Sequence, residues 1–127
     1  MLLHSKILGD TENHILILHG FLGSGDNWIT IARKLNFERF TVHLIDQRNH
    51  GRSYHSENFD YQLMSNDLLK YIKHHKIKDP ILIGHSMGGK TVMKFSLESP
   101  KLVRKLFVLD ISPKAVSYTH LTLPTKA

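Results

Sequence analysis

The chain contains no cysteine, and this absence excludes several kinds of chemistry. Without cysteine there can be no disulfide, no thiolate metal site and no cysteine nucleophile. The same absence is compatible with a reducing compartment, and we expect a cytoplasmic location. The sequence pattern indicates neither a cofactor nor a metal site.

Long hydrophobic runs are also missing. No apolar stretch approaches the roughly 18–20 residues that a membrane-spanning helix needs. The N-terminus, Met1–Lys6, lacks the charged start and long apolar segment of a signal peptide. Internal repeats and low-complexity segments are absent as well. We therefore expect at most one domain, with no membrane partner.

Acidic residues are the scarcer charge, with 11 Asp and Glu against 17 Lys and Arg, which gives a net charge of +6. A basic balance can indicate nucleic-acid binding when the cations form a stripe. Here they are scattered along the chain and fall mostly on predicted solvent faces and in the last turns of helices, where they complement the helix dipole. We expect no nucleic-acid partner.

What the sequence does contain is an alternation of strands and helices. Short apolar runs predict strands, and residues 60–75 and 87–98 have helical patterns, the first with Met64 and Leu68 at the spacing of a buried helix face. The predicted strands are residues 1–8, 15–18, 40–45, 81–83 and 106–111. This order is typical of an α/β fold with a mostly parallel sheet and helices on both faces. Ligands bind such sheets at the carboxyl ends of the strands, where His19, Asp46, Ser86 and Asp110 are all expected.

The most informative motif is Gly84-His85-Ser86-Met87-Gly88, which lies between a predicted strand and a predicted helix. In that context G-x-S-x-G is the turn that exposes a nucleophilic serine under backbone strain. A serine also needs a histidine to accept its proton and a carboxylate to orient that histidine. The alternative is a tight glycine turn without catalytic function. We favour Ser86 as a nucleophile.

A second glycine-rich loop, Gly20–Gly25, follows the strand at residues 15–18. Such a loop can present a backbone N–H, here that of Phe21, to a developing oxyanion, and the N–H of Met87 would be the second donor. The alternative, a glycine turn leading into a helix, does not exclude this role. We expect His19 to be a structural hydrogen-bonding residue.

Two further acidic positions leave alternatives open. The loop from Asp46 to Ser53 could bind anionic substrates, but we favour a structural loop in which Asp46 and Arg48 bond to nearby backbone. Asp110 could orient a catalytic histidine, or it could open the turn that follows the strand. Spacing alone does not separate these two roles.

Together these motifs resemble the α/β-hydrolase superfamily and, within it, the YbfF-type esterases. The resemblance is carried by the strings His19–Ser24, Asp46–Ser53, Gly84–Lys90 and Leu109–Ile111. It implies a serine esterase that cleaves small-molecule acyl esters or thioesters. Ser86 would be the nucleophile, Phe21 and Met87 the oxyanion donors and Asp110 the acid. The fold could also carry a non-catalytic binding module, or a lyase or C–C hydrolase.

One member of the catalytic set is missing. In this fold the histidine follows the last strand, and none of the ten histidines is placed there. His120 lies on an extension too short to position it. We interpret residues 1–113 as the N-terminal part of a hydrolase domain, truncated after about its sixth strand. Residues 114–127 form a tail without family counterpart, which we interpret as foreign. Such a fragment should be inactive and should self-associate through its exposed edge strand, Leu106–Leu109.

Overall fold

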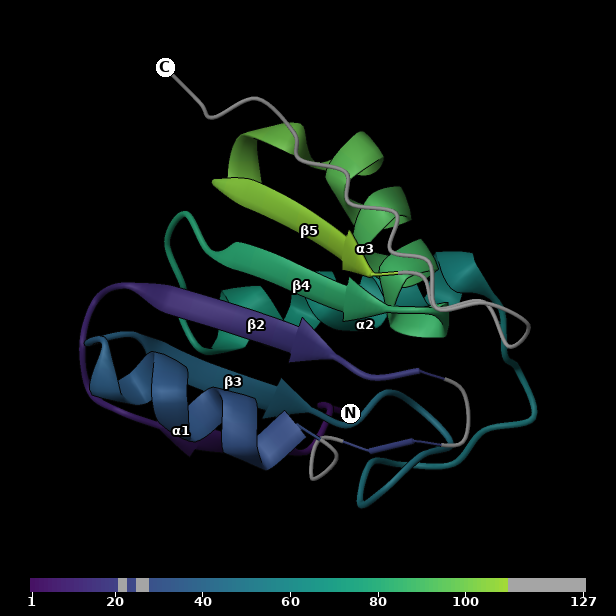
Figure 1. Ribbon diagram of the computed structural model, residues 1–127. Helices are drawn as coiled ribbons and strands as arrows, with labels where there is room; N and C mark the ends of the chain where they lie inside the picture. Colours follow the sequence, from purple (N-terminus) through teal and green to yellow (C-terminus); the bar gives the residue numbers. More distant parts are fainter. Residues whose placement is uncertain (21–22, 25–27, 110–127) are drawn as a thin grey trace.

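The computed structural model describes residues 1–20, 23–24 and 28–109. Within them the secondary structure alternates as expected for an α/β fold (Figure 1). The strands are β1 (Ser5–Leu8), β2 (His14–Leu18), β3 (Thr41–Ile45), β4 (Ile81–His85) and β5 (Lys105–Leu109). The α-helices are α1 (Ile29–Phe37), α2 (Tyr61–His74) and α3 (Met87–Glu98), and a 3₁₀ turn, η2 (Pro100–Leu102), precedes β5.

The five described strands form one sheet in the order β1-β3-β2-β4-β5. β2 pairs in parallel with both β3 and β4, and β4 pairs in parallel with β5. Of the five described strands only β1 is antiparallel, and it runs along the outer side of β3. The carboxyl ends of β2, β3, β4 and β5 therefore meet at one edge of the sheet, which confirms the predicted convergence for the strand ends that are described.

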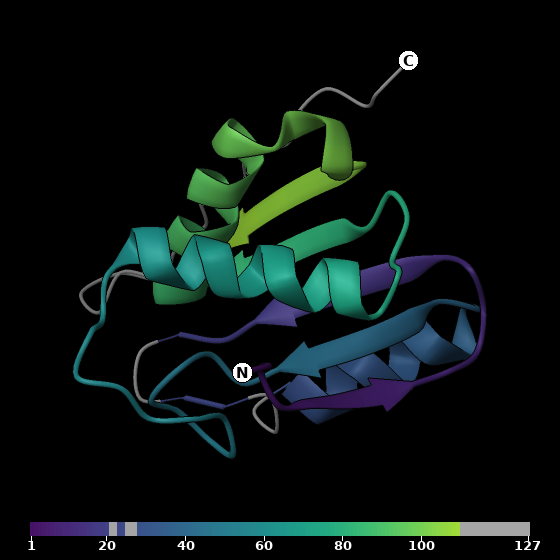
Figure 2. The same ribbon diagram turned by 180° about the vertical axis from the view of Figure 1, so that it is seen from behind.

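Helices cover both faces of the sheet, as predicted. Figures 1 and 2 show α1 on one face and α2 and α3 together on the other. The larger core lies under α2 and α3, where Leu68, Tyr71 and Phe95 pack against Leu16 and Leu82 of the strands. A smaller cluster around Ala32 lies under α1. These buried apolar side chains hold the strand ends in place, and the turns at those ends form the candidate site.

The α2 pattern follows from its sequence. Asp60 precedes the helix with extended backbone, and its carboxylate accepts a hydrogen bond from the N–H of Leu63, which satisfies one of the unpaired donors at the helix start. Met64 and Leu68 recur at helical spacing and are buried, as predicted. None of the helices in the described ranges is long and apolar enough to cross a bilayer.

Candidate active site

Ser86 forms the entire turn between β4 and α3. The strand ends at His85, the helix begins at Met87, and Ser86 between them has a φ of 53° and a ψ of −111°. A residue other than glycine rarely adopts a positive φ, so the predicted backbone strain at Ser86 is confirmed. The Ser86 N–H donates to the carbonyl of Leu109 (2.9 Å), and its carbonyl accepts from the N–H of Lys90 (3.1 Å). The turn is held from both sides while the side chain stays exposed.

The flanking glycines are required by close backbone contacts. A Cβ atom on Gly88 would lie 2.1 Å from the carbonyl oxygen of Leu18, and one on Gly84 would lie 2.3 Å from the carbonyl oxygen of Gly88. Neither distance is possible for a real side chain. The first turn of α3 therefore packs directly on the end of β2, and this packing brings the Ser86 turn next to the loop that follows β2.

That loop begins beside the serine. A Cβ atom on Gly20 would lie 3.4 Å from the Cβ of Ser86 and 2.9 Å from Nδ1 of His85. Met87 is the first residue of α3, so its N–H belongs to the helix donors that have no partner within the helix. The structure thus brings Ser86, Met87 and the start of the glycine loop together. Phe21 and Asp110, the other two predicted site residues, lie outside the described residues.

His19 is a structural residue, as expected from the sequence. Its ring is buried, with Nδ1 2.7 Å from the carbonyl oxygen of Gly20, while Nε2 accepts from the N–H of Gln47 at 2.9 Å. These partners require a neutral ring with its proton on Nδ1. Burial lowers the pKa of His19 below its ordinary value, which agrees with that neutral form.

The loop after β3 is held by a buried ion pair. Arg48 binds the carboxylate of Asp67 in α2 through Nε (2.7 Å) and Nη2 (2.8 Å), and its Nη1 donates to the carbonyl of Asn58 (2.7 Å). The hydrogen bond to Asp67 raises the pKa of Arg48, so the guanidinium stays charged. Asp46 accepts from the backbone N–H of Arg52 (3.1 Å). The structural interpretation of this loop is confirmed, although the partner Asp67 was not predicted.

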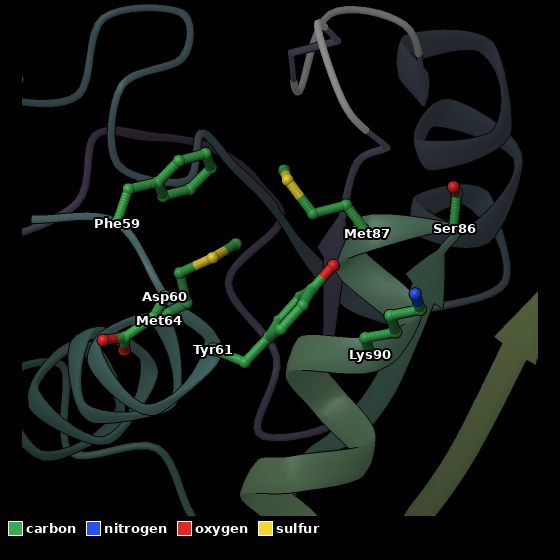
Figure 3. Close-up of a pocket in the computed structure, with 7 residues that line it drawn as sticks. All are labelled: Phe59, Asp60, Tyr61, Met64, Ser86, Met87 and Lys90. Carbon is green, nitrogen blue, oxygen red and sulfur yellow. The ribbon is translucent and has the colours of Figure 1, made fainter.

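The exposed Ser86 side chain lines a pocket of about 270 Å³. Figure 3 shows its walls, with Phe59 and Met64 facing Met87 across the space. Among the described residues, those that line it are Phe59, Asp60, Tyr61, Met64, Ser86, Met87 and Lys90. Lys90 lies one turn after Ser86 on α3, and its Nζ is 5.8 Å from the ring centre of Tyr61. Sequence reasoning placed Met64 in the core and gave Phe59, Tyr61 and Lys90 no role in the site.

The described histidines near Ser86 contact other groups. The His85 ring lies edge-on to Trp28 with 5.7 Å between centroids. His50 Nδ1 lies 2.9 Å from the carbonyl oxygen of Arg48. Within the described ranges no histidine forms a hydrogen bond with the Ser86 hydroxyl. The same ranges contain no group of three His, Cys, Asp or Glu side chains placed to hold a metal ion.

A strained, exposed serine between a parallel strand and a helix is typical of one particular fold. The family model described as the alpha/beta hydrolase fold matches residues 13–125. The chain belongs to the α/β-hydrolase family. This confirms the fold predicted from the sequence motifs.

Known members of the family with similar sequences are named for acyl chemistry. The chain is 48% identical over 99 residues to a Haemophilus influenzae protein called "Putative esterase/lipase", covering 78% of this chain and 34% of that protein. It is 45% identical over 100 residues to the sn-1-specific diacylglycerol lipase ABHD11 of Xenopus laevis, covering 78% of this chain and 32% of the lipase. The chain thus spans about a third of the length of these curated relatives.

Two further similar proteins are an esterase and an acetyltransferase. The solved structure of a marine microorganism esterase superposes with a TM-score of 0.84 at 48% identity, covering 88% of this chain and 42% of the esterase. Ethanol acetyltransferase 1 of Hanseniaspora uvarum is 38% identical over 109 residues, covering 85% of this chain and 33% of that enzyme.

Proposed function

We propose that the whole protein is a serine hydrolase that cleaves small-molecule acyl esters or thioesters through an acyl-enzyme on Ser86. The observation that carries the proposal is the Ser86 turn, with its positive φ, its exposed side chain and the adjacent glycine loop. The esterase and lipase names of similar proteins support the same reaction class. The YbfF-type resemblance remains our proposal for the subfamily.

The chemistry would proceed in two steps. Ser86 Oγ attacks the acyl carbon and its proton passes to a histidine, which then gives that proton to the departing alcohol or thiol. Water next attacks the acyl-enzyme, the same histidine accepts its proton and passes it to Ser86 Oγ as the acyl–serine bond breaks, and the carboxylic acid is released. The N–H groups of Phe21 and Met87 would bind the oxyanion, and each such donor is typically worth about 3–4 kcal/mol in the transition state.

The base would come from outside these 127 residues, and Asp110 would orient it. A chain that lacks the histidine keeps only the contribution of the oxyanion donors and of binding, and losing the base costs several orders of magnitude in rate. We therefore expect little turnover from the 127-residue chain alone.

The pocket supports an acyl chain of short to medium length. Phe59, Met64 and Met87 form a largely apolar wall beside the serine, and about 270 Å³ is the space available between the described residues. A long chain would need walls contributed by the remaining part of the whole protein.

A second candidate, transfer of the acyl group to an alcohol, is favoured by the similarity to an ethanol acetyltransferase. The acyl-enzyme would be the same, and only the acceptor would differ. A non-catalytic binding module, or a lyase or C–C hydrolase, are the remaining alternatives on this fold. Product analysis with and without added ethanol separates ester formation from hydrolysis.

A fluorophosphonate probe tests the nucleophile in the full-length protein. We expect covalent labelling that disappears in Ser86→Ala. Ser96→Ala is the matched control, because this serine lies in the same helix and its buried hydroxyl has no hydrogen-bond partner among the described residues. It should be labelled like the wild type. A folded full-length protein that resists the probe would contradict the hydrolase proposal and favour the binding module.

A further inference from the structure

The buried Gln47 connects the two backbone segments beside the serine. It lies just after β3 and is 1% exposed. Its side-chain Nε2 donates to the carbonyl of His19 (2.9 Å), and its Oε1 accepts from the hydroxyl of Thr91 (2.8 Å). Its own N–H donates to His19 Nε2 (2.9 Å). One side chain thus joins the end of β2 to the second turn of α3.

The orientation of this amide is fixed by its partners. The His19 carbonyl is only an acceptor, so it must face the NH₂ group, which leaves Oε1 for Thr91. The Thr91 hydroxyl has a single hydrogen and is also 3.2 Å from the carbonyl oxygen of Met87. The shorter distance assigns that hydrogen to Gln47. His19, Gln47, Met87 and Thr91 are all buried. Because a buried polar group that loses its hydrogen-bond partner destabilises the fold, these hydrogen bonds hold Gln47 in one orientation.

The network continues into the glycine loop. The Gly20 carbonyl accepts from His19 Nδ1 (2.7 Å) and from the N–H of Gly23 (3.0 Å). These two hydrogen bonds hold the Gly20 carbonyl at the start of the glycine loop. On the other side Thr91 lies one turn after Met87 in α3. The bridge therefore spans the two segments from which the proposed oxyanion donors come.

We propose that Gln47 is a positioning residue that sets the separation of the end of β2 and the first turns of α3, the segments from which the proposed oxyanion donors come, through its bridge from His19 to Thr91. This inference rests on the proposed function. Gln47 is not among the described residues that line the pocket, so its removal should affect the transition state rather than substrate binding. A displacement of an ångström can cost on the order of 100-fold in rate.

Kinetics of the full-length protein on a p-nitrophenyl ester test the bridge. We expect Gln47→Leu to lower kcat about 10- to 100-fold with KM within about twofold. Thr91→Val should also lower kcat, whereas Thr91→Ser, which keeps the hydroxyl, should have the kcat of the wild type. Affinity for a trifluoromethyl ketone, which forms a tetrahedral adduct with the serine, should fall in parallel with kcat. Ser96→Ala is again the control and should match the wild type.

A second measurement is independent of turnover. Amide hydrogen exchange of the segment from His19 to Ser24 should be faster in Gln47→Leu and in Thr91→Val than in the wild type, while exchange in α2 should stay unchanged. Unchanged kcat and unchanged exchange in Thr91→Val would overturn the positioning role. If the folded wild type has no activity, the hydrolase proposal fails, and the exchange comparison still decides whether the bridge holds the loop.

Discussion

His43, in the middle of β3, lies in a chain of hydrogen bonds between side chains under α2. It is 2% exposed, with Nε2 2.9 Å from Nδ1 of His14 and Nδ1 2.7 Å from the hydroxyl of Tyr71. The Tyr71 hydroxyl donates onward to Ser5 (2.7 Å), so His43 donates to Tyr71 and accepts from His14. The charges of the nearby His14 and His75 rings also disfavour a proton on His43. Burial, with these two rings nearby, lowers the pKa of His43 to about 3.

This pKa predicts loss of stability in mild acid. The unfolded chain takes up a proton near the ordinary pKa of 6.5, while the folded chain resists it down to about 3. The contribution of His43 is therefore complete above pH 6.5 and is lost as the pH falls toward 3, at up to about 1.4 kcal/mol per pH unit. Urea unfolding of the full-length protein between pH 7 and pH 4 measures this slope. His43→Leu should show a shallower slope, even though its stability at pH 7 is lower, and parallel curves would contradict the prediction.

At the scale of elements, the Arg48–Asp67 pair ties the loop after β3 to α2. Both side chains are buried, and Asp67 also accepts a hydrogen bond from the hydroxyl of Tyr54. Since Phe59 and Tyr61 lie where this loop enters α2, the pair also places one wall of the pocket.

Removing one member of the pair should be costly. We expect Arg48→Met to lower the free energy of unfolding by about 3–5 kcal/mol, because the Asp67 carboxylate stays buried without its partner. The double variant Arg48→Met with Asp67→Leu should recover part of that loss. Arg52→Met, in the same loop but exposed, should stay within about 0.5 kcal/mol of the wild type. Chemical denaturation measures the free energy of unfolding of the wild type and of the three variants. Equal losses in Arg48→Met and Arg52→Met would rule out this role for the pair.

The sequence predicted those features that neighbouring residues determine. The apolar runs gave β2, β4 and β5, and the spacing of Met64 and Leu68 gave the buried side of α2. The Ser86 turn could be predicted because its glycines, strand and helix are contiguous. The pairing of Arg48 with Asp67, 19 positions apart, could not, since nothing local to either residue names the other. For the same reason Phe59 and Lys90 carried no sequence signal for a pocket that exists only once α2 lies beside α3.

At the scale of the whole molecule, the position of β5 decides how the 127-residue chain should behave in solution. Among the described strands β5 pairs only with β4, at one end of the sheet order. An apolar edge strand is a template for pairing with another chain. We therefore expect this chain alone to be poorly soluble or oligomeric, as light scattering across a concentration series would show. A monodisperse monomer would contradict the expectation.

The strained backbone of Ser86 lowers the stability of the fold at the position of the proposed nucleophile. A φ of 53° with a ψ of −111° costs a serine on the order of 1–3 kcal/mol, whereas a glycine tolerates it far better. The replacement that relaxes the turn is thus also one that removes the proposed nucleophile. Directed evolution toward heat resistance, run without an activity requirement, should therefore select substitutions at position 86 that raise stability and remove the proposed activity.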